Sequence, residues 1–138
     1  MIHLDTNALI ALPLWAREGH PIILRIANGE PAGVSAVAWY EFLIGPVTDH
    51  EVGLAHAFVR GTIVAVETTD ARLAATLYNE AGRRRTLKTD ALIAAVSLRA
   101  EAEFLTLNTD DFQPFVKNGL RLLHHDGIRM TSQGVALK

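Results

Sequence analysis

The feature that most constrains the fold is a short apolar run that ends on a carboxylate and leads directly into a helical pattern. Residues 2–4 (IHL) are typical of a buried strand, Asp5 follows at once, and residues 8–11 (ALIA) indicate a helix. Ligands of open α/β sheets bind beyond the carboxyl ends of the strands, so Asp5 is a candidate site residue. On this segment alone an N-cap is the favoured explanation, because Asp accepts hydrogen bonds from the free N–H groups at a helix start.

Short strand patterns and helical patterns alternate along the rest of the chain. We predict strands at residues 31–34, 62–66, 103–107 and 120–123, and helices at 22–28, 36–45, 49–60, 71–85 and 91–102. The continuous β-branched and apolar run at 62–66 favours a strand that is covered on both faces. Residues 108–112 are expected to form a polar turn, and His124 and His125 to mark the end of the last strand.

This alternation predicts an α/β fold in three layers, with a central, mostly parallel sheet, right-handed crossovers and helices on both faces. We expect a single domain over residues 1–138, in which the polar residues 131–138 form a loosely ordered tail.

Composition limits the class of protein. With 138 residues and 49% hydrophobic side chains, the chain can bury a substantial core without cross-links. It has no cysteine, which excludes disulfides and thiolate metal sites. The net charge of −2 argues against a uniformly basic nucleic-acid-binding surface. Neither a signal-peptide pattern nor an apolar run of membrane-spanning length is found, so we expect a cytoplasmic protein without membrane contact.

Three carboxylates, Asp5, Glu41 and Asp90, occupy positions that call for an explanation. Glu41 is the only charge in the predicted helix 36–45, and burial of an unpaired carboxylate is costly. Asp90 directly precedes the almost wholly apolar residues 91–97, where an N-cap or a first-turn acid is the structural alternative. Several acids can converge on one site when cations neutralise their repulsion, so a shared metal explains all three.

Oxygen ligands of this kind suit Mg²⁺ or Mn²⁺ better than zinc, and the six histidines show no zinc-ligand spacing. Two such cations about 4 Å apart activate a water and stabilise the leaving oxygen in phosphodiester hydrolysis, which requires no serine or cysteine nucleophile. A fourth acidic cluster, Asp110 and Asp111, follows the strand at 103–107. Turn formation is their structural alternative.

Four motifs, in order along nearly the whole chain, resemble those of PIN-domain ribonucleases, and most closely of the VapC-type toxins of toxin–antitoxin pairs. The motifs are IHLDTNALIAL, VSAVAWYEFLIG, LKTDALIAAVSL and FLTLNTDDF. The resemblance implies that the acids of the first three motifs, Asp5, Glu41 and Asp90, are the catalytic metal ligands.

The fourth acid of this family is variable, and in this chain Asn108, Asp110 and Asp111 compete for its position. We favour Asp110 as the fourth carboxylate, with Asn108 orienting a metal or a water and Asp111 capping the turn that follows. Thr6 and Asn7 are then expected to take over the capping role at the first helix and to support the site.

The resemblance also implies the reaction and the partners. It predicts a toxin that cuts structured RNA, such as tRNA or rRNA, with Mg²⁺ or Mn²⁺ as cofactor. It further predicts a homodimer and a cognate antitoxin whose basic segment enters the acidic groove. The basic residues Arg83, Arg84, Arg85 and Lys88 precede Asp90 and fit RNA phosphate binding beside the metals, although a solvated helix end explains them equally well.

Two other functions are weighed against the ribonuclease. A catalytically silent PIN-like module that binds RNA or protein is disfavoured, because it has no use for mutually repelling acids. A haloacid-dehalogenase-like phosphatase requires a second acid two residues after Asp5, where this chain has Asn7. Trp15, Trp39 and Tyr40 are interpreted as core or dimer contacts rather than as base-stacking platforms.

Overall fold

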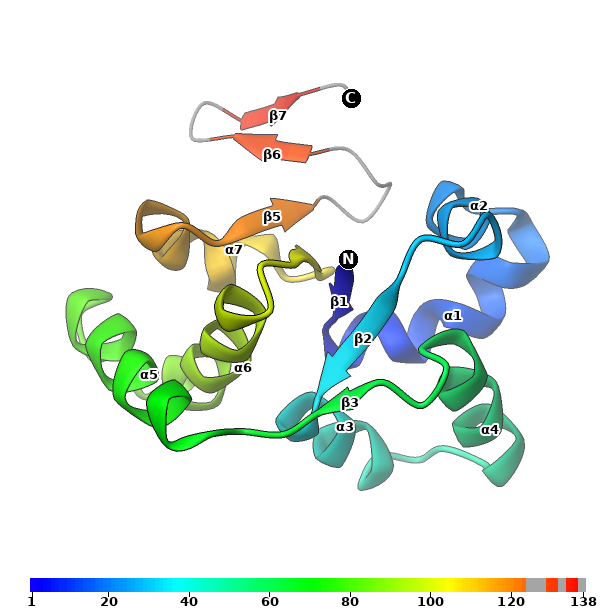
Figure 1. Ribbon diagram of the computed structural model, residues 1–138, viewed down its shortest axis with the longest axis horizontal. Helices are drawn as coiled ribbons and strands as arrows, with labels where there is room; N and C mark the ends of the chain where they lie inside the picture. Colours follow the sequence, from blue (N-terminus) through cyan, green and yellow to red (C-terminus); the bar gives the residue numbers. More distant parts are fainter. Residues whose placement is uncertain (124–128, 132–133, 137–138) are drawn as a thin grey trace.

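The computed structural model describes residues 1–123, 129–131 and 134–136. Within these residues, seven strands form one sheet in the order β3-β2-β1-β4-β5-β6-β7 (Figure 1). The strands are β1 (Ile2–Leu4), β2 (Ala32–Ser35), β3 (Ile63–Val64), β4 (Glu103–Leu105), β5 (Arg121–Leu123), β6 (Arg129–Thr131) and β7 (Gly134–Ala136). Strands β1 to β5 pair in parallel, and β6 and β7 continue the sheet in antiparallel pairs.

Helices cover both faces of this sheet. They are α1 (Thr6–Glu18), α2 (Pro21–Ala27), α3 (Ala36–Leu43), α4 (Asp49–Phe58), α5 (Thr68–Glu80), α6 (Lys88–Arg99) and α7 (Thr109–Phe112), with 3₁₀ turns η1 (Arg85–Leu87) and η2 (Gln113–Asn118). Helices α1 to α4 lie on one side of the sheet and α5 to α7 on the other (Figure 1). The predicted three-layer α/β fold with a mostly parallel sheet is confirmed. Among the described residues, no helix has both the length and the apolar character needed to cross a membrane.

Strand β1 lies at the centre of the parallel part of the sheet, between β2 and β4. Its residues Ile2 and Leu4 are completely buried, because the sheet is covered on both faces. The chain leaves β1 at Asp5, whose backbone N–H donates to the carbonyl of Leu105 on β4 over 2.9 Å. The carboxyl ends of β1 and β4 are therefore joined side by side at one edge of the sheet.

An ion pair fixes the helix hairpin that carries Asp90. Arg99, at the end of α6, donates from Nε and Nη2 to the two carboxylate oxygens of Asp70 on α5, over 2.8 and 3.0 Å. Asp70 is 1% exposed, and Arg99 also donates to the carbonyl of Ala65. On α5, Leu77 is completely buried and belongs to the hydrophobic core.

The structure differs from the sequence-based expectations at several elements. Strand β3 is shorter than the predicted 62–66 and only half-buried, because it is an edge strand paired with β2 alone among the described residues. The helix predicted to reach residue 85 ends at Glu80, since Gly82 and Arg83 have positive φ angles of 88° and 58°. Residues 109–112 form helix α7 rather than a turn.

The C-terminal expectations are only partly covered by the structure. The predicted strand end at His124 and His125 lies outside the described residues. The predicted tail, 131–138, is described only at Thr131 and in β7. Strands β6 and β7, which the sequence analysis did not predict, form a hairpin in which Met130 lies opposite Val135.

Candidate active site

Asp5 is both a helix cap and a buried acid at the centre of the sheet edge. Its side chain is held by two donors, the backbone N–H of Thr6 on Oδ1 and the hydroxyl of Thr106 on Oδ2, each at 2.8 Å. Asp5 is only 6% exposed. The expectation that Thr6 and Asn7 take over the capping role is wrong, because Asp5 itself is the N-cap of α1. The capping and the functional explanations of this residue are therefore compatible.

Within the described residues, Glu41 has a hydroxyl rather than a cation as its partner. Thr6 Oγ1, in the first turn of α1, lies 3.0 Å from Glu41 Oε1 and 3.3 Å from the carbonyl of Ala38. Glu41 is half-buried, so water still solvates part of its charge. The hydrogen bond nevertheless orients the carboxylate of α3 toward the start of α1. Thr6 thus contacts Glu41, and its predicted supporting role in the site stays a prediction.

Asp90 lies in the first turn of α6 and is half-buried. Burial raises its pKa to about 7, together with the negative charges of Asp5, Asp111 and Glu41. A first-turn acid is normally stabilised by the helix dipole, which favours its charged form. The raised pKa therefore shows that α6 carries Asp90 into the field of three other carboxylates.

The pKa of Asp5 is also raised, and the causes identify the same neighbours. Burial has the largest effect, the hydrogen bonds from Thr106 and Thr6 oppose it, and the charges of Glu41 and Asp111 raise the pKa further. Four acids from separate elements thus interact at one edge of the sheet. They are Asp5 after β1, Glu41 on α3, Asp90 on α6 and Asp111 on α7.

Among the candidates for the fourth carboxylate, Asp111 acts on these acids through its charge, and the favoured Asp110 stays a prediction. Both side chains are exposed on α7, but only Asp111 is among the charges that raise the pKa values of Asp5 and Asp90. Asn108 is the N-cap residue of α7, and its backbone carbonyl accepts from the N–H of Asp111 over 3.1 Å. Residues 107–111 line a small hollow of about 260 Å³.

The loop after β4 contains a residue that the sequence analysis missed. Thr106 is completely buried, and its hydroxyl contacts Asp5, the backbone N–H of Asn108 and the side chain of Asn7. Asn7 in turn accepts from the backbone N–H of Leu107 over 3.0 Å. A threonine at the end of an apolar strand is common, and the only signal in its favour was its place in the motif FLTLNTDDF.

All four predicted basic residues are exposed, and among the residues that the structure describes only Arg83 of the four has a side-chain hydrogen bond or ring contact. Arg83 contacts Asn79 through its guanidinium and stacks over the ring of Tyr78 at 5.4 Å from the centroid. Arg84, Arg85 and Lys88 are exposed around η1 and the start of α6. Lys88 therefore lies two positions before Asp90 on the same first turn.

The three aromatic residues singled out in the sequence differ in their surroundings. Trp15 is 6% exposed and stacks on His20 at 4.5 Å between ring centroids. Trp39 is half-buried and packs against Phe42. These two contacts agree with core packing. Tyr40 is 63% exposed and therefore is not a core residue.

The residues at this edge provide the donor type that Mg²⁺ and Mn²⁺ prefer, because all four acids offer carboxylate oxygens. The charges of neighbouring acids contribute to the raised pKa values of Asp5 and Asp90. A shared cation would relieve this repulsion. Within the described part of the chain, however, no three acidic or histidine side chains already form a closed metal-binding cluster. The donor set fits a hard cation, and the acids do not yet converge on a single point.

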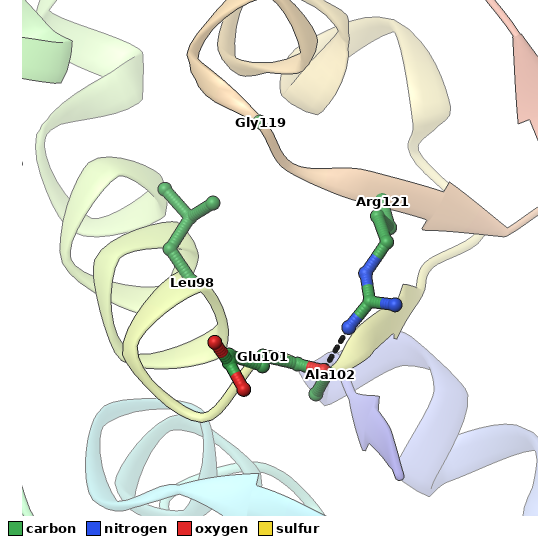
Figure 2. Close-up of a pocket in the computed structure, with 5 residues that line it drawn as sticks. All are labelled: Leu98, Glu101, Ala102, Gly119 and Arg121. Atoms are coloured by element: carbon green, nitrogen blue, oxygen red, sulfur yellow. Dashed lines mark hydrogen bonds between the residues drawn. The ribbon is translucent and has the colours of Figure 1, made fainter.

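A larger hollow lies at the other end of the strands. It measures about 460 Å³ and is lined by Leu98, Glu101, Ala102, Gly119 and Arg121 (Figure 2). Ala102 and Arg121 adjoin the starts of β4 and β5, and the Arg121 guanidinium donates to the carbonyl of Glu101. None of the interacting acids lines this hollow. The candidate site is therefore formed by the acids at the carboxyl ends of the strands.

Comparison with known proteins places these observations in a family context. The model of the PIN domain family matches residues 2–116. A toxin–antitoxin complex from Klebsiella pneumoniae has a TM-score of 0.62 at 24% identity, covering 81% of this chain and 90% of that chain. FitAcB from Neisseria gonorrhoeae has a TM-score of 0.62 at 19% identity, covering 88% and 96%. VapBC-1 from nontypeable Haemophilus influenzae has a TM-score of 0.56 at 19% identity, covering 91% and 98%.

These solved structures share the fold of the chain. A search of curated protein sequences gives no match.

Proposed function

Because the chain belongs to the PIN domain family, we propose that it is a Mg²⁺- or Mn²⁺-dependent endoribonuclease that acts as the toxin of a toxin–antitoxin pair. One observation carries this proposal: burial, together with the charges of carboxylates from separate elements, raises the pKa values of Asp5 and Asp90. Mutual repulsion of this kind destabilises the fold unless a cation relieves it. Metal-assisted chemistry would explain why the fold places these acids together despite the repulsion between them.

Asp5, Glu41, Asp90 and Asp111 are the residues that would hold the metal. When bound, Mg²⁺ or Mn²⁺ would supply an activated water and stabilisation of the leaving oxygen in phosphodiester hydrolysis. The chain itself positions the carboxylates. Thr106 and Thr6 hold Asp5 from two sides, and Thr6 also contacts Glu41. Asn108 would contribute by orienting α7, since its carbonyl accepts from Asp111.

The exposed cations beside Asp90 support RNA as the substrate. Arg84, Arg85 and Lys88 are free to contact phosphates, and they lie directly before the acid of α6. Arg83 contributes less, because Asn79 and Tyr78 already hold its guanidinium. A structured RNA such as tRNA or rRNA would then lie across the acids, with the protein acting in the cytoplasm.

A protein partner is supported by an apolar surface on the α1–α3 side. Large apolar side chains are exposed on α1, α2 and α3 and at the C-cap of α3: Ile10, Leu14, Leu24, Tyr40, Leu43 and Ile44. Soluble monomers rarely expose extensive apolar patches, so these helices are suited to a second copy of the chain and to an antitoxin. The solved structures from Klebsiella pneumoniae and Haemophilus influenzae are a toxin–antitoxin complex and VapBC-1, which favours the same assignment. A basic antitoxin segment would complement the acids.

Expression in bacterial cells tests the proposed toxin function. The wild-type chain is expected to arrest growth and to degrade RNA, and the Asp5→Asn variant is expected to restore growth at the same protein level. The alternative of a catalytically silent binding module predicts that Asp5→Asn arrests growth as strongly as the wild type, or that neither protein degrades RNA. Protein levels measured by immunoblotting provide the control.

A further inference from the structure

Thr106 connects the two halves of the acidic site through three polar neighbours. Its hydroxyl oxygen lies 2.8 Å from Asp5 Oδ2, 3.0 Å from the backbone nitrogen of Asn108 and 3.4 Å from Asn7 Nδ2. Asn7 Oδ1 lies 3.0 Å from the backbone nitrogen of Leu107. The hydroxyl is completely buried, so water does not compete for these contacts.

The direction of each hydrogen bond follows from groups whose chemistry is fixed. The backbone N–H of Leu107 can only donate, so Asn7 must turn its amide oxygen to Leu107 and its NH₂ group to Thr106. The backbone N–H of Asn108 likewise donates to the Thr106 hydroxyl. With both acceptor positions of the oxygen occupied, the single hydroxyl hydrogen must point to Asp5 Oδ2.

We propose that Thr106 is a positioning residue that fixes the Asp5 carboxylate in the orientation required for metal binding. Oδ1 receives the N–H of Thr6 and Oδ2 receives the Thr106 hydroxyl, which leaves each oxygen a lone pair for a cation. Through Asn108 the same hydroxyl holds the loop that leads into α7 and Asp111. Thr106 thereby sets the position of Asp5 relative to the acid on the opposite side. This role rests on the proposed metal-dependent function.

The proposal is tested by titrating the full chain with Mn²⁺ in an isothermal calorimeter, without RNA. Partners that orient a metal ligand typically contribute about 10- to 100-fold to metal affinity, so Thr106→Val is expected to bind Mn²⁺ more weakly by about this factor. Thr106→Ser keeps the hydroxyl and is expected to bind with nearly wild-type affinity. Thr76→Val is the matched control, because Thr76 is exposed on α5 and bonds only to the carbonyl of Arg72 within its own helix.

RNA cleavage adds a second measurement. Because Thr106 acts through Asp5, the Val variant is expected to need a higher Mn²⁺ concentration for half-maximal rate and to recover at saturating Mn²⁺. Should Thr106→Val be unfolded by circular dichroism, Thr106→Ala is compared with Thr106→Ser in the same titration. Weak binding by Ala and recovery by Ser support the proposal.

Two results would overturn it: wild-type Mn²⁺ affinity in the folded Val or Ala variant, or equally weak binding by the Ser variant. The Asp5→Asn variant separates this proposal from the proposed function. If Asp5→Asn loses Mn²⁺ binding while the Thr106 variants keep it, only the role of Thr106 is wrong. If Asp5→Asn binds Mn²⁺ as well as the wild type does, the proposed metal site itself is wrong.

Discussion

Asp90 on α6 and Asp5 at the end of β1 are distant in sequence, but they interact directly through their charges. Burial, followed by the charge of Asp5, raises the pKa of Asp90 to about 7. Asp5 is itself buried, and hydrogen bonds from Thr6 and Thr106 hold it in place. The fold therefore brings two acids together at the cost of repulsion between them.

Removing one of these charges is expected to stabilise the metal-free protein. At pH 8 in EDTA, Asp90→Asn should raise the free energy of unfolding by about 1 kcal/mol, because it removes repulsion from a half-buried carboxylate. Urea denaturation measures the change. The control Asp49→Asn, on the surface at the start of α4, should instead lower stability slightly. Mg²⁺ should stabilise the wild type and leave Asp90→Asn unchanged; a destabilised Asp90→Asn in EDTA would contradict the account.

The neighbouring acids of α7 offer a matched pair of variants. Asp111→Asn is expected to weaken Mn²⁺ binding about 10-fold, because its charge acts on both Asp5 and Asp90. Asp110→Asn removes the same charge from the adjacent residue and should leave the affinity near that of the wild type. Calorimetric Mn²⁺ titration of both variants distinguishes them. A larger loss of Mn²⁺ affinity in Asp110→Asn than in Asp111→Asn would instead support Asp110 as the fourth carboxylate, as the sequence analysis favours.

The exposed cations before Asp90 are expected to contact RNA phosphates. Arg85→Ala and Lys88→Ala should each weaken RNA binding and reduce the slope of log affinity against log salt by roughly 1, while the fold is retained. Arg17→Ala, at the end of α1, is the control for loss of one surface charge. Fluorescence anisotropy over a salt series measures both quantities. Wild-type affinity and slope in both variants would exclude these residues from the RNA interface.

The ion pair of Asp70 with Arg99 gives a prediction for the scaffold rather than for the site. Burial raises the pKa of Asp70, but hydrogen bonds from Arg99 and from the backbone of Glu67 outweigh it and lower the pKa below its ordinary value. Asp70→Asn should therefore lower the free energy of unfolding at pH 7 by about 1–2 kcal/mol, a small effect because solvent reaches Arg99.

The pH dependence of that difference has a definite sign. A lowered pKa in the folded state means that the stabilisation is present above the ordinary pKa of Asp and is lost as the pH falls through the folded-state pKa. Urea denaturation of wild type and Asp70→Asn should thus give stabilities that converge below about pH 4. A difference that stays constant down to pH 2 would show that the carboxylate charge is not its origin.

The fold and the acids Asp5, Glu41 and Asp90 could be predicted from the sequence, for physical reasons. Strand and helix periodicity places Asp5 at the end of a buried strand, and the lone charge of Glu41 in an apolar helix marks it as unusual. Asp90 is marked in a similar way, because the almost wholly apolar residues 91–97 follow it directly. By contrast, the half-burial of Glu41 and its hydrogen bond to Thr6 depend on how α3 packs against α1, which local patterns do not specify.

The identity of the fourth carboxylate could not be predicted from the sequence, for a different reason. Asp110 and Asp111 are adjacent on a short helix that was predicted as a turn, and a turn does not specify which of the two charges acts on Asp5. Thr106 was missed because its importance lies in contacts with residues far away in the sequence, Asp5 and Asn7. Sequence patterns report which face of an element is buried, but they do not report which polar groups meet there.

RNA cleavage by the purified chain tests the central claim most directly. The account predicts cleavage of structured RNA with Mg²⁺ or Mn²⁺, loss of cleavage in EDTA with recovery on adding Mn²⁺, and loss of at least about 100-fold in rate for Asp5→Asn under either metal. Asp110→Asn, prepared in parallel, is expected to cleave nearly as well as the wild type. Cleavage that persists in EDTA and in Asp5→Asn would contradict the metal-dependent ribonuclease assignment.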